Sequence, residues 1–153
     1  LILQELSKTC PVLTLRLPGV VGPKYFTPWI GKTALKAARG ETISIFNPES
    51  LFNNIVDIEE LFRIINILLT RDLSGYTITN VAPGQAMKLQ SVVELIVSQL
   101  GSKSRIEVKE ANQKSFSISS ENLEKLLGGP AELTETIIRR WLAANQETLR
   151  ATV

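Results

Sequence analysis

The sequence predicts a mixed α/β fold, and two hydrophobic patterns lead to that prediction. Short apolar runs bounded by proline or glycine are typical of buried strands. Longer stretches with apolar residues three and four positions apart are typical of amphipathic helices. Strand-like and helix-like segments alternate along the chain, as they do in α/β proteins. The strands are few and short, so a self-contained doubly wound sheet is not expected.

The first segments are predicted to be a helix end, a buried strand and a loop. Residues 1–8 carry apolar side chains compatible with a final helical turn or two. Residues 12–17 form an apolar run between two prolines, which is typical of a strand in a parallel sheet. The dipeptides Pro18-Gly19 and Gly22-Pro23 then mark a loop.

The middle of the chain contains the strongest helical signal. Residues 29–39 fit a helix that Gly40 ends as a left-handed cap. Residues 42–46 alternate like a strand, and residues 53–58 are a second short strand candidate. Helical spacing then links six apolar residues, which are Ile58, Leu61, Phe62, Ile65, Leu68 and Leu69.

The last part of the chain is predicted to alternate short strands with helices. Strands are expected at residues 76–81 and 105–108. Ser91 and Glu94 fit a capping box that opens a helix, which Gly101 ends. Two further helices are expected, one capped by Ser119 or Ser120 and ending at Leu127, and one over residues 133–150 with Ile137, Trp141 and Ala144 on one stripe.

Composition excludes several classes of function. The 153 residues carry 17 Lys and Arg against 15 Asp and Glu without a basic run, so nucleic acid is not an expected partner. Histidine is absent, which excludes His-based catalytic triads and His-ligated metal sites, and no metal is expected. The single cysteine, Cys10, the lack of a signal pattern and the lack of an apolar run of roughly 20 residues predict a cytoplasmic protein without a membrane partner.

Four segments, in this order, resemble motifs of the NAD-dependent epimerase/dehydratase family, a group of extended short-chain dehydrogenases/reductases. Residues 15–23, LRLPGVVGP, resemble the family's R-x-x-N-V-Y-G-P strand and loop. Residues 53–61, NNIVDIEEL, are similar to its R-D-F-V-H-V-D-D-L segment. Residues 119–128 resemble a helix that leads into a Leu-Gly pair, and residues 141–145, WLAAN, resemble the terminal W-x-x-x-N.

The resemblance implies the C-terminal part of a Rossmann-type extended short-chain dehydrogenase with its smaller mixed α/β substrate-binding lobe. Residues 1–23 would end the dinucleotide-binding domain, and residues 24–153 would mainly form the substrate-binding lobe and the C-terminal helices. The full-length parent would use NAD or NADP to oxidise a hydroxyl group of a small molecule, such as a nucleotide sugar, and then epimerise, dehydrate or reduce the intermediate. A homo-oligomer is left open.

The family's Tyr-x-x-x-Lys helix and Gly-rich loop have no counterpart in these residues, so no catalytic residue is assigned. The chain alone is therefore expected to be inactive. By the same resemblance, Pro18, Gly19 and Val20 would contact the cofactor. The resemblance also implies that Gly19, Pro23, Trp29 and Asn53 would contact the substrate.

Each of these residues also has a structural interpretation. Pro18 to Val20 also fit a simple turn at a strand end, and Trp29 also fits a core position. Asn53 stands where sugar-nucleotide members often have an arginine, and an amide supplies neither the charge nor the paired donors of a guanidinium. The acidic group Asp57, Glu59 and Glu60 favours helix capping over acid–base chemistry, and Trp141 favours packing.

Two other functions remain open at this point. The first is a non-catalytic module of the same fold that senses dinucleotides or binds other proteins, because fold does not settle function. The second is a stand-alone small α/β domain. The residues upstream of Leu1 would separate the enzyme from the module, since a Tyr-x-x-x-Lys motif and a Gly-rich loop there would favour the enzyme.

Overall fold

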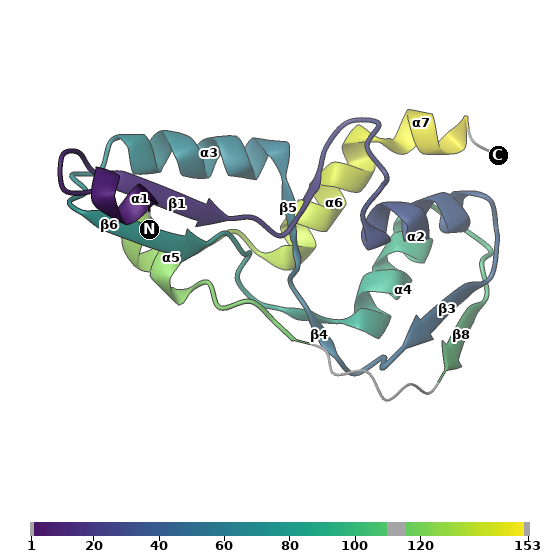
Figure 1. The fold of residues 1–153 in the computed structure, drawn as a ribbon. Coiled ribbons are helices and arrows are strands. Elements are labelled where there is room, and N and C mark those ends of the chain that lie inside the picture. Colours follow the sequence, from purple (N-terminus) through teal and green to yellow (C-terminus); the bar gives the residue numbers. More distant parts are fainter. Residues whose placement is uncertain (1, 110–115, 152–153) are drawn as a thin grey trace.

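Helices are interspersed with short strands in the structure, a computed structural model that describes residues 2–109 and 116–151 (Figure 1). The helices are α1 (Ile2–Leu6), α2 (Trp29–Ala38), α3 (Ile58–Leu69), α4 (Leu89–Gln99), α5 (Glu121–Leu127), α6 (Thr134–Ala144) and α7 (Gln146–Arg150). The strands are β1 (Val12–Arg16), β2 (Gly19–Val21), β3 (Ile43–Phe46), β4 (Leu51–Phe52), β5 (Ile55–Asp57), β6 (Tyr76–Asn80), β7 (Met87–Lys88) and β8 (Ile106–Lys109). The predicted mixed α/β class is confirmed.

Within the described residues, the strands pair in twos. The pairs β1–β6, β2–β5 and β3–β8 are parallel, and β4–β7 is antiparallel. In the longest pair Val12 lies opposite Tyr76 and Arg16 lies opposite Asn80. Parallel partners need long crossover connections, which explains why helices separate them in the sequence.

Two hydrophobic cores hold these elements together. The first core lies among α2, β3, α4, α6 and α7 and contains the buried Trp141. The second lies among α3, α5 and the β1–β6 pair, with Leu13 and Leu15 of β1 against it. The β2–β5 pair supplies both cores, because Val21 and Ile55 belong to the first while Val20 and Val56 belong to the second. The β2–β5 pair therefore joins the two cores.

Helix ends show which local predictions were right. Gly40 and Gly101 have left-handed backbone angles, with φ of 67° and 61°, and each directly follows the C-cap residue of its helix, Arg39 of α2 and Leu100 of α4. The predicted cap at Ser91 is wrong, because α4 begins at Leu89 after Lys88 and has no side-chain cap. Gln90 instead donates a hydrogen bond to Glu94 at 2.8 Å.

Two other segments also differ from the prediction. The expected loop after Pro18 contains strand β2, because its backbone pairs with β5 from Gly19 to Val21. The expected final helix is broken at Asn145 into α6 and α7. No helix among the described residues has the length and apolar character needed to cross a membrane.

Candidate substrate-binding site

The predicted cofactor segment lies at the carboxyl end of a parallel strand. β1 ends at Arg16, opposite the last residue of β6, and the chain then passes through Leu17 and Pro18 into β2. In open α/β sheets, ligands bind outside the carboxyl ends of parallel strands. The position of Pro18, Gly19 and Val20 is therefore compatible with the contact that the sequence predicts, which stays a prediction.

Gly19 allows three segments to approach closely. A β-carbon at this position would lie 3.2 Å from the carbonyl oxygen of Asn54 and 3.7 Å from the Cβ of Pro28. A side chain here would thus point at the chain itself, so any contact that Gly19 offers to a ligand comes from its backbone. The close approach also places β2 beside the residue that precedes Trp29.

Trp29 lines an apolar hollow at the start of α2. The hollow has a volume of about 330 Å³ and is lined by Trp29, Ser44, Ile45, Phe46, Phe52 and Leu89. The rings of Trp29 and Phe52 lie 5.3 Å apart and are tilted by 52°. Trp29 is 41% exposed and Phe46 is 48% exposed, so both offer aromatic surface to solvent. This exposure rules out the core position that the sequence also allowed for Trp29.

Asn53 has a structural role in this conformation. Its side chain is buried, and its Nδ2 donates to the carbonyl oxygens of Pro83 at 3.2 Å and Ile118 at 2.7 Å. Its Oδ1 accepts a hydrogen bond from the backbone nitrogen of Ile118 at 2.8 Å. The amide thus joins three distant segments, and both of its polar atoms are engaged. A substrate contact by Asn53 stays a prediction to which this geometry gives no support.

Pro23 lies away from the Trp29 hollow. It lines a different hollow of only about 20 Å³, formed with α6 and the start of α3. The loop that contains it is held by Trp141, whose Nε1 donates to the Gly22 carbonyl at 3.1 Å, and by Asn145, whose Oδ1 accepts from the Lys24 nitrogen at 2.7 Å. Phe26 packs edge-on against Trp141, with ring centres 5.8 Å apart. The W-x-x-x-N segment therefore holds this loop, and the packing role predicted for Trp141 is confirmed.

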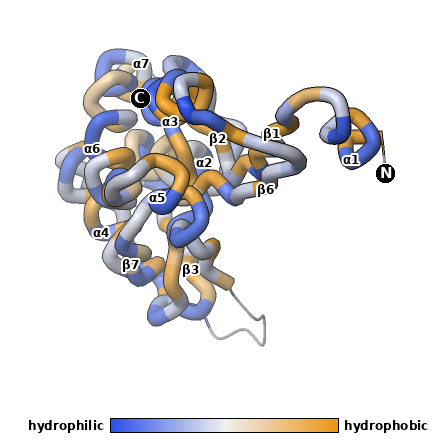
Figure 2. Tube along the Cα trace, turned by 90° about the vertical axis from the view of Figure 1, so that its left-hand side faces the viewer, coloured by the Kyte–Doolittle hydropathy of each residue, from blue (hydrophilic) through white to orange (hydrophobic). Residues whose placement is uncertain are grey.

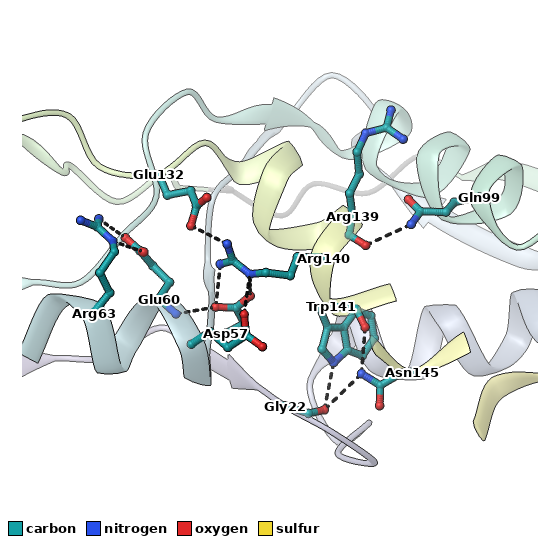
Figure 3. A network of polar contacts seen from close by, with 11 residues as sticks. Gly22, Asp57, Glu60, Arg63, Gln99, Glu132, Arg139, Arg140, Trp141 and Asn145 are labelled. Carbon is teal, nitrogen blue, oxygen red and sulfur yellow. Dashed lines mark hydrogen bonds and ion pairs between the residues drawn. The ribbon is translucent and has the colours of Figure 1, made fainter. Parts of the chain in front are cut away.

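A charged network connects α3 to α6 (Figure 3). Asp57 caps α3 by accepting a hydrogen bond from the Glu60 nitrogen at 2.8 Å, which confirms the predicted capping. Asp57 also accepts two hydrogen bonds from Arg140, which donates a third to Glu132. The hydrogen bond to Asp57 is the main cause that raises the pKa of Arg140 above its ordinary value, although burial opposes it.

The neighbouring pair Arg63 and Glu60 repeats this arrangement. Two hydrogen bonds of 2.6 Å join the guanidinium to the carboxylate, and they raise the pKa of Arg63. With Arg140 and Glu132, this pair borders an open hollow of about 560 Å³ between α3 and α6. These charges already pair with one another, which favours a structural role. No local sequence pattern indicates the role of Arg140, because 83 positions separate it from Asp57.

Comparisons with known proteins agree with this architecture. No protein-family model matches the chain, and no curated protein matches it. Solved structures do match. RMD from Pseudomonas aeruginosa, complexed with NADPH, superimposes with a TM-score of 0.73 at 19% identity, over 99% of this chain and 53% of that one.

Two other solved structures give the same result. The dTDP-glucose 4,6-dehydratase of Bacillus anthracis, in complex with NAD, has a TM-score of 0.70 at 20% identity, over 99% of this chain and 51% of the other. The UDP-glucose 4-epimerase of Thermotoga maritima, with UDP-glucose, has a TM-score of 0.71 at 16% identity, over 97% and 50%. The likeness is in the fold. The chain spans about half the length of each of these proteins.

Proposed function

We propose that this chain forms the C-terminal, substrate-binding part of an NAD(P)-dependent epimerase/dehydratase that acts on a sugar nucleotide or a related hydroxylated small molecule. One observation carries the proposal: Gly19, which begins β2 shortly after the carboxyl end of β1, meets Pro28, the residue directly before Trp29 of the exposed Trp29–Phe52 hollow. The likeness to solved structures that hold NADPH, NAD and UDP-glucose supports the same function.

The residues proposed to contact the cofactor are better suited to van der Waals contact than to hydrogen bonding. Pro18 has no N–H to donate and Gly19 has no side chain, so both offer surface contact more readily than hydrogen bonds. When bound, NAD or NADP would supply the hydride chemistry. Pro18 to Val20 would limit where the nicotinamide and the substrate meet, and no residue of this chain is assigned a proton-transfer role.

The Trp29 hollow would bind the planar or apolar part of the substrate. Its lining is aromatic and aliphatic apart from Ser44, which is the character of small-molecule sites. Its lining residues bear no charge, and Asn53 is turned into the fold, so a diphosphate would have to be neutralised by residues outside the hollow. The domain assignment of residues 1–23 and 24–153, the cytoplasmic location and a homo-oligomer belong to this proposal as predictions.

Measuring the affinity of the protein for UDP-glucose by titration tests the proposal directly. We expect binding in solution, and we expect Trp29→Ala to weaken it about tenfold, which corresponds to about 1.4 kcal/mol. Tyr25→Ala is the matched control, because Tyr25 is an aromatic residue of similar exposure, at 50%, outside the hollow. Equal affinities of both variants and the wild type would show that the site is elsewhere.

The non-catalytic module is the second candidate, and the engaged side chain of Asn53 is the observation that favours it. Turnover measurements separate the two functions. The 153-residue chain alone is expected to reduce no NAD in the presence of substrate. If the protein is an enzyme, a longer polypeptide that contains this chain is expected to reduce NAD under the same conditions. Dinucleotide binding by that longer polypeptide without any turnover would favour the module.

A further inference from the structure

The loop of residues 22–28 joins β2 to α2, and side chains from the end of α6 hold it in place (Figure 3). The Gly22 carbonyl accepts hydrogen bonds from Trp141 Nε1 at 3.1 Å and from Asn145 Nδ2 at 3.4 Å. The Oδ1 of Asn145 accepts a hydrogen bond from the backbone nitrogen of Lys24 at 2.7 Å. Trp141 and Asn145 are almost fully buried, so water does not compete for these hydrogen bonds.

The backbone of Lys24 needs this support. Its φ of 59° lies in the left-handed region, which residues other than glycine rarely adopt. The Tyr25 nitrogen donates to the Gly22 carbonyl at 3.3 Å and closes a turn over residues 22–25. A backbone conformation of this kind persists where the surrounding contacts hold it. The hydrogen bond from Lys24 to Asn145 therefore helps to fix the shape of the turn.

Phe26 connects this turn to α2. Its ring packs edge-on against the ring of Trp141, with centres 5.8 Å apart. Its backbone lies directly against Gly31 in the first turn of α2, where a β-carbon would come within 2.5 Å of it. In Figure 1 the loop rises from β2 beside α6 and returns to the start of α2. Phe26 therefore lies between Trp141 and the first turn of α2.

Trp29 occupies the least restrained position of α2, because it is the first residue of the helix. Pro28, the N-cap residue, makes no side-chain capping hydrogen bond, and helices loosen first at their ends. Ile30 is buried in the first core, whereas Trp29 is 41% exposed and contacts the ring of Phe52. The position of the Trp29 ring therefore depends on the loop that precedes it.

We infer that Trp141 and Asn145 are positioning residues for Trp29 and so set the affinity of the hollow that Trp29 lines. They act through residues 22–28 rather than by touching a ligand. Figure 2 shows α2 and α6 in the main body of the protein, away from the projecting α1, and both helices contribute to the first core. The effect on substrate affinity rests on the proposed function, whereas the coupling to Trp29 does not.

Fluorine NMR of the 153-residue chain labelled with fluorotryptophan tests the coupling, because the protein contains only two tryptophans. Trp29→Phe identifies the two resonances. Asn145→Ala is expected to shift the Trp29 resonance and to weaken UDP-glucose binding by about threefold or more, as couplings through packed residues do. Gln99→Ala is the matched control, because this amide donates to the Arg139 carbonyl of α6 at 3.0 Å and not to the loop. It is expected to change neither measurement.

The outcomes separate this inference from the proposed function. An unchanged Trp29 resonance in folded Asn145→Ala, an equal shift in Gln99→Ala, or a shift without any loss of UDP-glucose affinity would overturn the inference. If the wild type binds no UDP-glucose, a Trp29 shift confined to Asn145→Ala would support the coupling and contradict the proposed function. Circular dichroism verifies folding, and Asn145→Ser, which keeps one polar side-chain atom in place of two, replaces the alanine variant if that variant does not fold.

Discussion

Arg140 donates two hydrogen bonds to Asp57 and so connects the middle of α6 to the start of α3. The distances are 2.7 Å from Nε to Oδ2 and 2.9 Å from Nη2 to Oδ1. The Asp57 side chain is only 4% exposed, and Arg140 is 30% exposed. A carboxylate at this depth depends on its partners, because water cannot replace them.

Arg140→Ala is therefore expected to destabilise the protein strongly. The buried carboxylate of Asp57 would lose its cationic partner, and such a loss typically costs about 3–5 kcal/mol. Urea unfolding measures the change in free energy. Arg139→Ala is the control, because Arg139 pairs with Glu135 at the surface and such a pair is worth about 0.3–0.5 kcal/mol. Equal losses in the two variants would contradict the assigned role.

The pH dependence of this pair follows from the raised pKa of Arg140. A folded-state pKa above the unfolded value contributes stability that is present below the unfolded pKa and lost as pH rises through the folded pKa. For arginine both values lie far above neutral, so the difference in stability between wild type and Arg140→Ala is expected to be the same at about pH 7 and about pH 10. Arg140→Lys is expected to lose stability at a lower alkaline pH than the wild type, because the ordinary pKa of a lysine is about 10.4. Denaturant unfolding at each pH measures this.

Asn53→Ala is expected to loosen the segment around Ile118. The substitution leaves the Ile118 N–H, the Ile118 carbonyl and the Pro83 carbonyl without this partner, and a buried unpaired group costs about 1–3 kcal/mol. Hydrogen exchange of the Ile118 amide should accelerate. Asn54→Ala, which removes the adjacent exposed amide, should leave the exchange rate unchanged. Faster exchange in both variants would mean that the effect is not specific to Asn53.

Gly31→Ala is expected to destabilise α2, although alanine usually favours a helix. A β-carbon at Gly31 would lie 2.5 Å from the Cα and the carbonyl oxygen of Phe26, so the loop before α2 must move. Overpacking of this kind costs about 1–3 kcal/mol, more than the roughly 1 kcal/mol that alanine gains over glycine in a helix. The melting temperature should fall. Gly129→Ala, which meets no atom within 4 Å, should leave it nearly unchanged, and an unchanged value for Gly31→Ala would show that the loop adapts freely.

The sequence predicted those parts of the fold that depend on local pattern. The run predicted at residues 12–17 contains β1 (Val12–Arg16), and Gly40 follows the end of α2, because strand hydrophobicity and left-handed caps are read from neighbouring residues. Strand β2 was missed because proline and glycine suggested a loop, whereas distant pairing with β5 decides its conformation. The exposure of Phe62 and Leu69 was also unpredicted, since periodicity shows that a helix is apolar but not which of its flanks is covered.

The candidate site was predicted less completely, for the same reason. Trp29 could be selected as an aromatic residue after the strand-ending loop, and the structure places it at a hollow. Pro23 is close to it in sequence but lies against α6, because Trp141 and Asn145 hold the loop there. The engagement of Asn53 with Ile118 spans 65 residues and leaves no local pattern to read.

The β2–β5 ladder also determines how this protein unfolds. Val20 and Val21 are adjacent on one strand, as are Ile55 and Val56 on the other, yet the two residues of each pair enter different cores. If either strand of this ladder detached from one core, its neighbouring side chain would also leave the other core. The chain should therefore unfold in a single cooperative transition rather than region by region. A destabilising substitution near Trp29 should then also lower the stability of α3.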